Sequence, residues 1–119
     1  FNLHKKVFSV RAMQGEKKGL VIAHMDKISI KNPQFKVSQA GRQRVLKEKR
    51  KNVHAFVQGE MMDFIGFDTR FDPVLEVTYN PYKYEQFVIK TSDDVKANDY
   101  GFEVVSLEAV DGKSSINGI

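Results

Sequence analysis

The most distinctive chemistry in the chain is a run of basic side chains between residues 42 and 51. A single acid, Glu48, stands there among six cations: Arg42, Arg44, Lys47, Lys49, Arg50 and Lys51. Arginine and lysine bind phosphate groups through charge and hydrogen bonds. We therefore expect an anionic partner, with nucleic acid or a phosphate-bearing nucleotide as the leading type. The residues expected to contact it are Arg42, Arg44, Lys47, Arg50 and Lys51.

A helix over about residues 38–51 is predicted to carry this cluster. Ser38 is a suitable N-cap, and the apolar residues that follow recur with a helical period. On a helical wheel Arg44, Lys47 and Lys51 share one stripe, which can follow a phosphate backbone. The alternative is a solvated helix face whose basic side chains only keep the protein soluble.

Aromatic side chains near the cluster and in a later turn are candidates for auxiliary contacts: His54, Phe56, Tyr82 and Tyr84. Exposed rings stack on bases in small β domains that bind single strands. The two tyrosines flank a turn, however, and there their rings can equally pack locally while their hydroxyls hydrogen-bond nearby. A histidine with a satisfied local hydrogen bond is likewise the alternative for His54.

Catalytic signals are weak, and no cofactor or metal site is predicted. The three histidines lack metal-ligand spacing and the chain has no cysteine. Carboxylates would hold Mg²⁺ for phosphodiester chemistry only if the fold brought them together. The candidate pairs are Glu60 with Asp63, Asp68 with Asp72, and Asp93 with Asp94. We expect a protein that is not an enzyme and rank a metal-dependent nuclease third among the hypotheses.

An apolar interface is the second hypothesis. Met61, Met62, Phe64 and Phe67 lie close together in the sequence, and methionine-rich surfaces adapt readily to protein partners. Such a patch, or an exposed strand edge, would suit a protein-directed inhibitor of a host or defence factor. The opposing interpretation is a core strand over residues 61–67, and the exposure of Met61 or Phe64 distinguishes the two.

The elements around these residues predict an α+β fold, with an antiparallel, hairpin-rich sheet or a partly open barrel and one main helix. With 119 residues, 41% of them hydrophobic, the chain can build one ordinary core. Alternation of apolar and polar residues predicts strands with one wet face, to which Ser29 is assigned. Strands are predicted over residues 7–13, 20–25, 28–37, 53–58, 74–79, 86–90 and 102–110, with Asn32-Pro33 breaking the third of these runs. Residues 1–110 are expected to form one compact domain and residues 111–119 a flexible tail.

Composition adds a mild positive charge of +4. The absence of cysteine fits a reducing compartment, and no apolar stretch approaches the roughly 20 residues of a membrane helix. We expect a cytoplasmic protein that does not engage a membrane. A homo-oligomer is compatible with these features.

The stretch from Gly41 to Val57, together with Tyr79-Asn80-Pro81-Tyr82-Lys83, resembles small accessory proteins of tailed bacteriophages. That group has no established activity, so the resemblance carries over no catalytic or binding residues. It implies a protein made in the host cytoplasm during infection. Such a protein would act on nucleic acid, on a host factor or on a nucleotide signal of host defence.

Overall fold

Antiparallel strands form most of the computed structural model, which describes residues 1–2, 4–50, 53–68, 70–71, 74–90 and 93–119. The strands are β1 (Phe8–Arg11), β2 (Val21–Met25), β3 (Lys27–Val37), β4 (Ala55–Met62), β5 (Leu75–Thr78), β6 (Val88–Ile89), β7 (Val104–Val110) and β8 (Lys113–Gly118). The helices are α1 (Gln39–Glu48) and the short α2 (Ala97–Tyr100). Each predicted strand has a counterpart here, and the α+β fold with one main helix is confirmed. The predicted break at Asn32-Pro33 is wrong, because β3 continues through these residues with a register shift between Lys31 and Gln34 that accommodates the proline.

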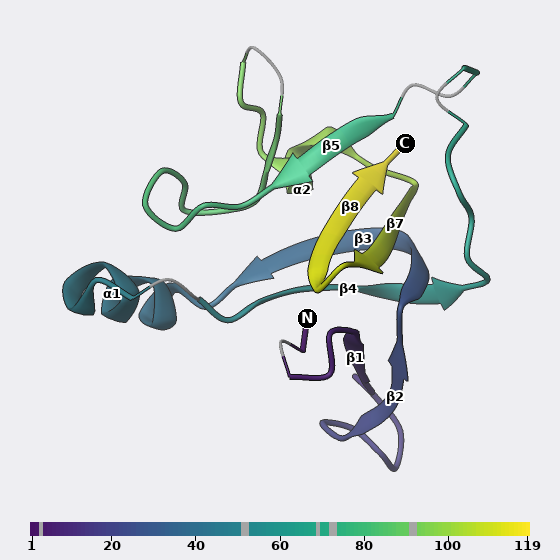
Figure 1. Cartoon of the computed structure of the whole chain (residues 1–119), viewed down its shortest axis with the longest axis horizontal. Coiled ribbons are helices and arrows are strands. Elements are labelled where there is room, and N and C mark those ends of the chain that lie inside the picture. Colours follow the sequence, from purple (N-terminus) through teal and green to yellow (C-terminus); the bar gives the residue numbers. More distant parts are fainter. Residues whose placement is uncertain (3, 51–52, 69, 72–73, 91–92) are drawn as a thin grey trace.

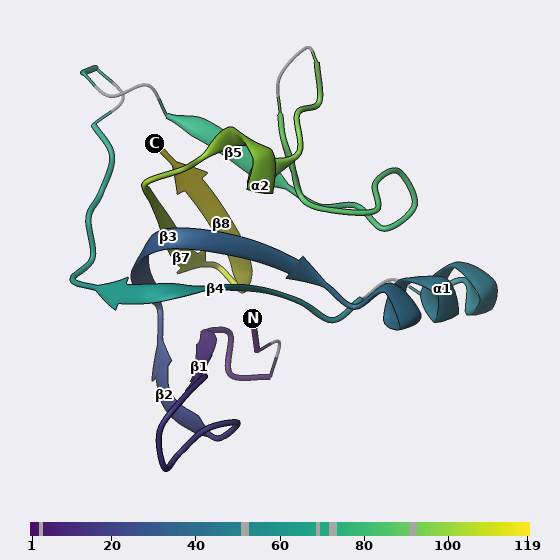
Figure 2. The same ribbon diagram turned by 180° about the vertical axis from the view of Figure 1, so that it is seen from behind.

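The strands form two sheets. Six of them make one curled sheet in the order β4-β3-β7-β8-β5-β6, and β1 pairs with β2 in a separate hairpin. Figure 1 shows that α1 and this hairpin project from the large sheet in different directions, and Figure 2 shows the same arrangement from behind. The two projections are therefore surfaces distinct from the body of the protein.

The core lies between the curled sheet and the elements that cover it. Eleven buried apolar residues form one cluster: Phe8, Ile28, Ile30, Phe35, Val77, Phe87, Ile89, Ala97, Phe102, Val105 and Leu107. Phe8 comes from the β1–β2 hairpin and Ala97 from α2, so both elements are fastened to the sheet by apolar contacts. Burial of such side chains contributes about 1.5–3 kcal/mol each for the larger ones.

Helix α1 begins where the sequence predicts it and ends sooner. The Ser38 Oγ accepts a hydrogen bond from the Gly41 amide at 3.1 Å, which is the expected N-cap. At the other end Lys49 adopts a left-handed conformation with φ 56°, and its amide bonds to the Val45 carbonyl. The prediction of a helix to residue 51 was therefore too long, and Lys51 itself lies outside the described residues.

The residues expected to form a flexible tail instead form β8. This strand pairs with β7 along its whole length and with β5 on its other side. Asp111 and Gly112, with φ of 52° and 75°, make the tight turn that leads into it. The prediction was wrong because these small polar residues show no strand-like alternation, and β8 is held mainly by backbone hydrogen bonds to its two neighbours.

Neither described helix is long and apolar enough to cross a membrane.

Candidate anion-binding site

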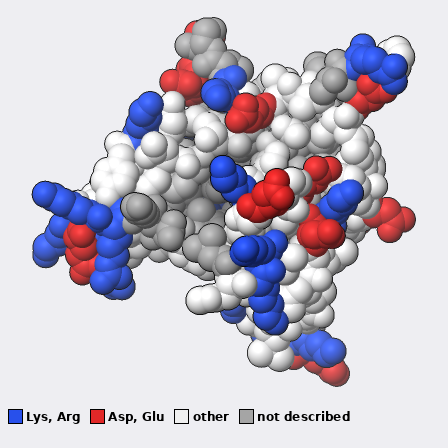
Figure 3. Space-filling model, in the orientation of Figure 1, with Lys and Arg blue, Asp and Glu red and all other residues white. Residues whose placement is uncertain are grey.

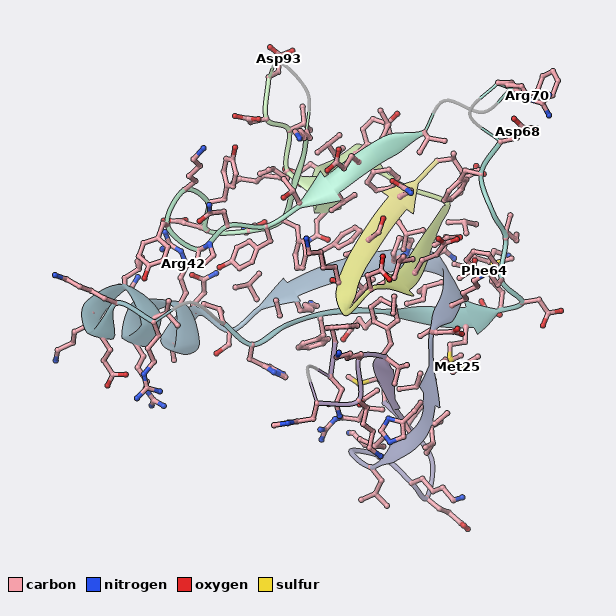
Figure 4. The ribbon with its side chains drawn as sticks, in the orientation of Figure 1. Met25, Arg42, Phe64, Asp68, Arg70 and Asp93 are labelled. Atoms are coloured by element: carbon pink, nitrogen blue, oxygen red, sulfur yellow. The ribbon has the colours of Figure 1, made fainter. Side chains whose placement is uncertain are left out.

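Arg42 anchors α1 to the turn that follows β5. Its Nε–H points at two backbone carbonyls of that turn, 3.0 Å from the Pro81 oxygen and 3.1 Å from the Tyr84 oxygen. The side chain is half-buried and lies between the helix and the turn in Figure 4. Sequence reasoning placed Arg42 among the ligand contacts, whereas in the structure its Nε is committed to the protein's own backbone.

Two further side-chain contacts hold the helix at its ends. The Tyr82 hydroxyl donates to the Arg50 carbonyl at 2.5 Å, and the Gln39 Nε2 donates to the Glu85 carbonyl at 2.8 Å. Tyr82 remains 54% exposed, so a local hydrogen bond and an accessible side chain coexist there. Because α1 is anchored near both ends, its outer side chains project from a fixed backbone.

The exposed cations on and beside α1 are Arg44, Lys47, Lys49 and Arg50. Arg50 pairs with Glu48 at 2.7 Å, and both side chains are substantially exposed, by 64% and 43%. An exposed pair of this kind contributes at most about 1 kcal/mol, so a phosphate can compete for the arginine. Figure 3 shows these basic side chains gathered over α1 at the left of the molecule.

The aromatic candidates do not all face solvent. His54, just before β4, and Phe56, at the start of β4, are exposed, with ring centroids 5.6 Å apart. Tyr84 is half-buried, and its hydroxyl lies 3.5 Å from the Asp94 carboxylate. Accessible rings near the helix are therefore those of His54, Phe56 and Tyr82.

Tyr79, whose ring is a further stacking candidate in the sequence, lies close to Arg42. Its ring packs on Phe87 with centroids 5.2 Å apart, and its buried hydroxyl has no hydrogen-bond partner among the described residues. Burial raises the pKa of Tyr79 above its usual 10.0, and the positive charge of Arg42 opposes part of that rise. The uncharged phenol is therefore the form that suits this packed position.

The candidate carboxylates do not form a metal site within the described residues. Figure 4 places Asp68 and Asp93 on separate loops of the molecule. Hydrogen bonds from Arg70 lower the pKa of Asp68, with the Arg70 Nε 3.2 Å from its carboxylate. Over the described parts of the chain, no three His, Asp or Glu side chains are arranged to hold a metal ion. Asp72 lies outside the described residues.

The methionine segment at the end of β4 is largely exposed. Met61 is 44% exposed and Phe64 36%, while Met62 and Phe67 are half-buried. Residues 63–67 leave the strand conformation, so the core-strand interpretation of 61–67 is wrong beyond Met62. A hollow of about 330 Å³ is lined by Met25, Lys27, Met61, Met62, Asp63 and Phe64. Met25 and Phe64 lie on the same side of the molecule in Figure 4.

A buried pair of serines fixes this segment. Ser29 on β3 and Ser106 on β7 face each other with their hydroxyl oxygens 2.6 Å apart. The Ile65 amide donates to the Ser29 Oγ at 2.8 Å, and the Ser106 hydroxyl donates to the Ile65 carbonyl. The alternation in the sequence assigned Ser29 to the solvent-exposed face of the sheet. This was wrong because the segment around Ile65 covers that face and hydrogen-bonds to Ser29. No local sequence signal indicated this covering.

The N-terminal 108 residues contain α1, the β1–β2 hairpin and the methionine segment, and they match the family described as the Mycobacterium phage L5 gene 82 protein. The chain belongs to this family. A relative, the gene 82 protein of Mycobacterium phage L5, is 35% identical over 98 residues, which cover 73% of this chain and 71% of the relative. No solved structure matches the chain significantly. The resemblance to phage proteins predicted from the sequence is confirmed.

Proposed function

We propose that this member of the gene 82 protein family is a small, non-enzymatic binding protein of the host cytoplasm. It sequesters or occludes an anionic partner, nucleic acid or a phosphate-bearing nucleotide, on the exposed cations of α1. The observation that carries the proposal is that Arg44, Lys47, Lys49 and Arg50 are exposed on and just beyond a helix whose backbone the 80–85 segment anchors.

Anchoring matters because binding to a mobile element costs conformational entropy. A helix that is already fixed presents its charges without that cost. Each lysine or arginine that meets a phosphate displaces condensed counterions, so affinity falls steeply with salt and depends little on base sequence. A surface of this kind suits a protein that covers or withholds its ligand rather than one that transforms it.

The test is a charge-matched comparison by fluorescence anisotropy on labelled 20-nucleotide DNA across a salt series. One variant carries Arg44→Gln, Lys47→Gln and Lys49→Gln. The control carries three substitutions at exposed lysines outside α1: Lys31→Gln, Lys90→Gln and Lys113→Gln.

Both variants lose three positive charges, so only the position of the charges differs. At about 0.7 per contact for single strands, the α1 variant is expected to flatten the slope of log K against log salt by about 2. The control should keep the slope of the wild type. Equal losses in the two variants would mean that only net charge matters and would refute a site on α1.

A protein partner is the second candidate, and the exposure of Met61 and Phe64 around a hollow favours it. In this role the protein would inhibit a host or defence factor through the apolar patch. The serine pair supports the idea because it holds Ile65, next to Phe64, in a fixed position.

Self-association measured by light scattering reports on the adhesion of this patch. Phe64→Asp should abolish self-association. Phe71→Asp should not, because Phe71, although 80% exposed, lies outside the hollow. Association that both variants weaken equally, or that neither affects, would remove the patch from consideration.

A further inference from the structure

Charge is segregated along this chain well beyond α1. Residues 1–24 carry one acid, Glu16, and five cations: Lys5, Lys6, Arg11, Lys17 and Lys18. Residues 38–50 likewise carry five cations and one acid. In contrast, residues 25–37 and 53–119 together contain eight basic and 13 acidic side chains. The protein therefore has two basic arms on an acidic body.

All five N-terminal cations are exposed, and none takes part in a salt bridge within the described residues. They belong to residues 1–24, which we call the hairpin arm and which comprise the N-terminal turn and most of the β1–β2 hairpin. The hairpin projects from the sheet separately from α1 in Figures 1 and 2. In Figure 3 basic side chains are visible on one face over α1 at the left and below the centre, and most of the acidic ones lie above and to the right, mixed with further basic ones. A single ligand can therefore approach both arms from one side.

The hairpin arm, like α1, has a fixed backbone. The Gly19 amide donates to the Ala12 carbonyl at 2.8 Å, and the Arg11 Nη1 donates to the Gly19 carbonyl at the same distance. Phe8 is buried in the core and packs on Phe1 with ring centroids 5.4 Å apart. Its cations are thus held in place relative to the sheet.

The start of β4 offers exposed rings close to the basic helix. β4 starts beside α1 and runs past the N-terminal arm in Figure 1. His54 and Phe56, exposed at its start, provide surfaces on which unpaired bases can stack.

From these features we infer that the N-terminal hairpin is a second contact surface for the ligand of α1, and that this ligand is a polymer with a phosphodiester backbone. The inference rests on the proposed function. A mononucleotide is too small to reach both arms, whereas a strand can. The longest extent of the protein is 43 Å, which corresponds to about 12 steps at roughly 3.4 Å per step. The acidic body repels phosphates and so directs the strand toward the arms.

The test uses three labelled probes: oligo-dT of five nucleotides, oligo-dT of 20 nucleotides, and a 20-base-pair duplex. The hairpin variant carries Lys6→Gln, Lys17→Gln and Lys18→Gln, which spares Arg11 and Lys5 because they bond to Gly19 and His24. It is compared with the α1 variant, with the combined variant and with the Lys31, Lys90 and Lys113 control.

On the 20-nucleotide strand each single-arm variant should lose about tenfold or more in affinity and about 2 in salt slope. On the five-nucleotide strand either arm suffices, so each single variant should lose about twofold and only the combined variant should fail. The tighter of the two 20-unit probes identifies whether single strands or duplexes supply the phosphodiester backbone.

A hairpin variant that binds the 20-nucleotide strand like the wild type, while the α1 variant fails, would overturn this inference and leave the proposed function intact. An α1 variant that binds like the wild type would overturn the proposed function itself. Circular dichroism of each variant establishes that the losses are not caused by unfolding.

Discussion

The hydrogen bonds of Arg42 distinguish a structural arginine from a ligand-binding one, and their removal has a calculable effect. Arg42→Met keeps an unbranched side chain of good helix propensity but removes the donor that serves the Pro81 and Tyr84 carbonyls. Arg44→Met, two residues away on an exposed face, makes the same chemical change where no such bond exists in the described structure. The pair isolates the contribution of the anchor.

The magnitude follows from the geometry. One Nε–H is shared between two carbonyls at 3.0 and 3.1 Å, and hydrogen bonds to a charged group contribute about 1.5–3 kcal/mol. Because Arg42 is only half-buried, we expect a loss of about 2 kcal/mol in the free energy of unfolding. For 119 residues, with an unfolding entropy of about 250 cal/mol/K, this lowers Tm by about 8 °C. Arg44→Met should stay within about 0.5 kcal/mol of the wild type.

Urea titrations followed by far-ultraviolet circular dichroism measure both free energies. A shift of the midpoint at constant slope would identify a change in stability rather than in the unfolded state. If Arg42→Met is as stable as Arg44→Met, the anchor contributes nothing, and Arg42 returns to the set of ligand contacts that the sequence suggested.

Two further predictions concern other contacts of the fold. The Asn98 side chain accepts a hydrogen bond from the Phe35 amide at 2.7 Å and donates one to the Phe35 carbonyl at 2.8 Å. Asn98→Ala should therefore lower the free energy of unfolding, measured by urea titration, by about 3 kcal/mol. A variant as stable as the wild type would show that this pair of hydrogen bonds is dispensable. Burial raises the pKa of Tyr79 in the folded state, so its contribution to stability is complete below about pH 10 and is lost as the pH rises through the folded-state pKa. Tyr79→Phe should remove that alkaline loss and be at least as stable at neutral pH, and Tm measured from about pH 8 to 11 checks this. A Tm that falls as steeply in the variant as in the wild type would assign the alkaline loss to other groups.

Local patterns predicted the elements of this protein well. Ser38 caps α1 because a serine before a helical period offers its hydroxyl to the first free amides, a contact that depends only on neighbours in sequence. The alternation in β3 and the position of the basic cluster are equally local. Asp-Gly is also a common dipeptide of two-residue hairpin turns. If Asp111-Gly112 had been taken as such a turn, the sequence would have predicted the β7–β8 hairpin.

Tertiary structure decided which side chains are free to act. Arg42 and Arg44 are alike in sequence, yet only Arg42 meets the carbonyls of a turn some forty positions along the chain. Ser29 is buried because the segment at Ile65 covers its face of the sheet. The same contact fixes the position of Ile65 and so leaves the adjacent Phe64 exposed.

The sequence by itself therefore determined the α+β class, the capped basic helix and the uneven charge, because these follow from residue types and short periods. Only the fold decided that the anchored arginine faces inward, that the last residues complete the sheet, and that the two basic segments stand as separate arms. These outcomes depend on contacts between residues far apart in the chain, and a local period carries no information about what will cover a given face.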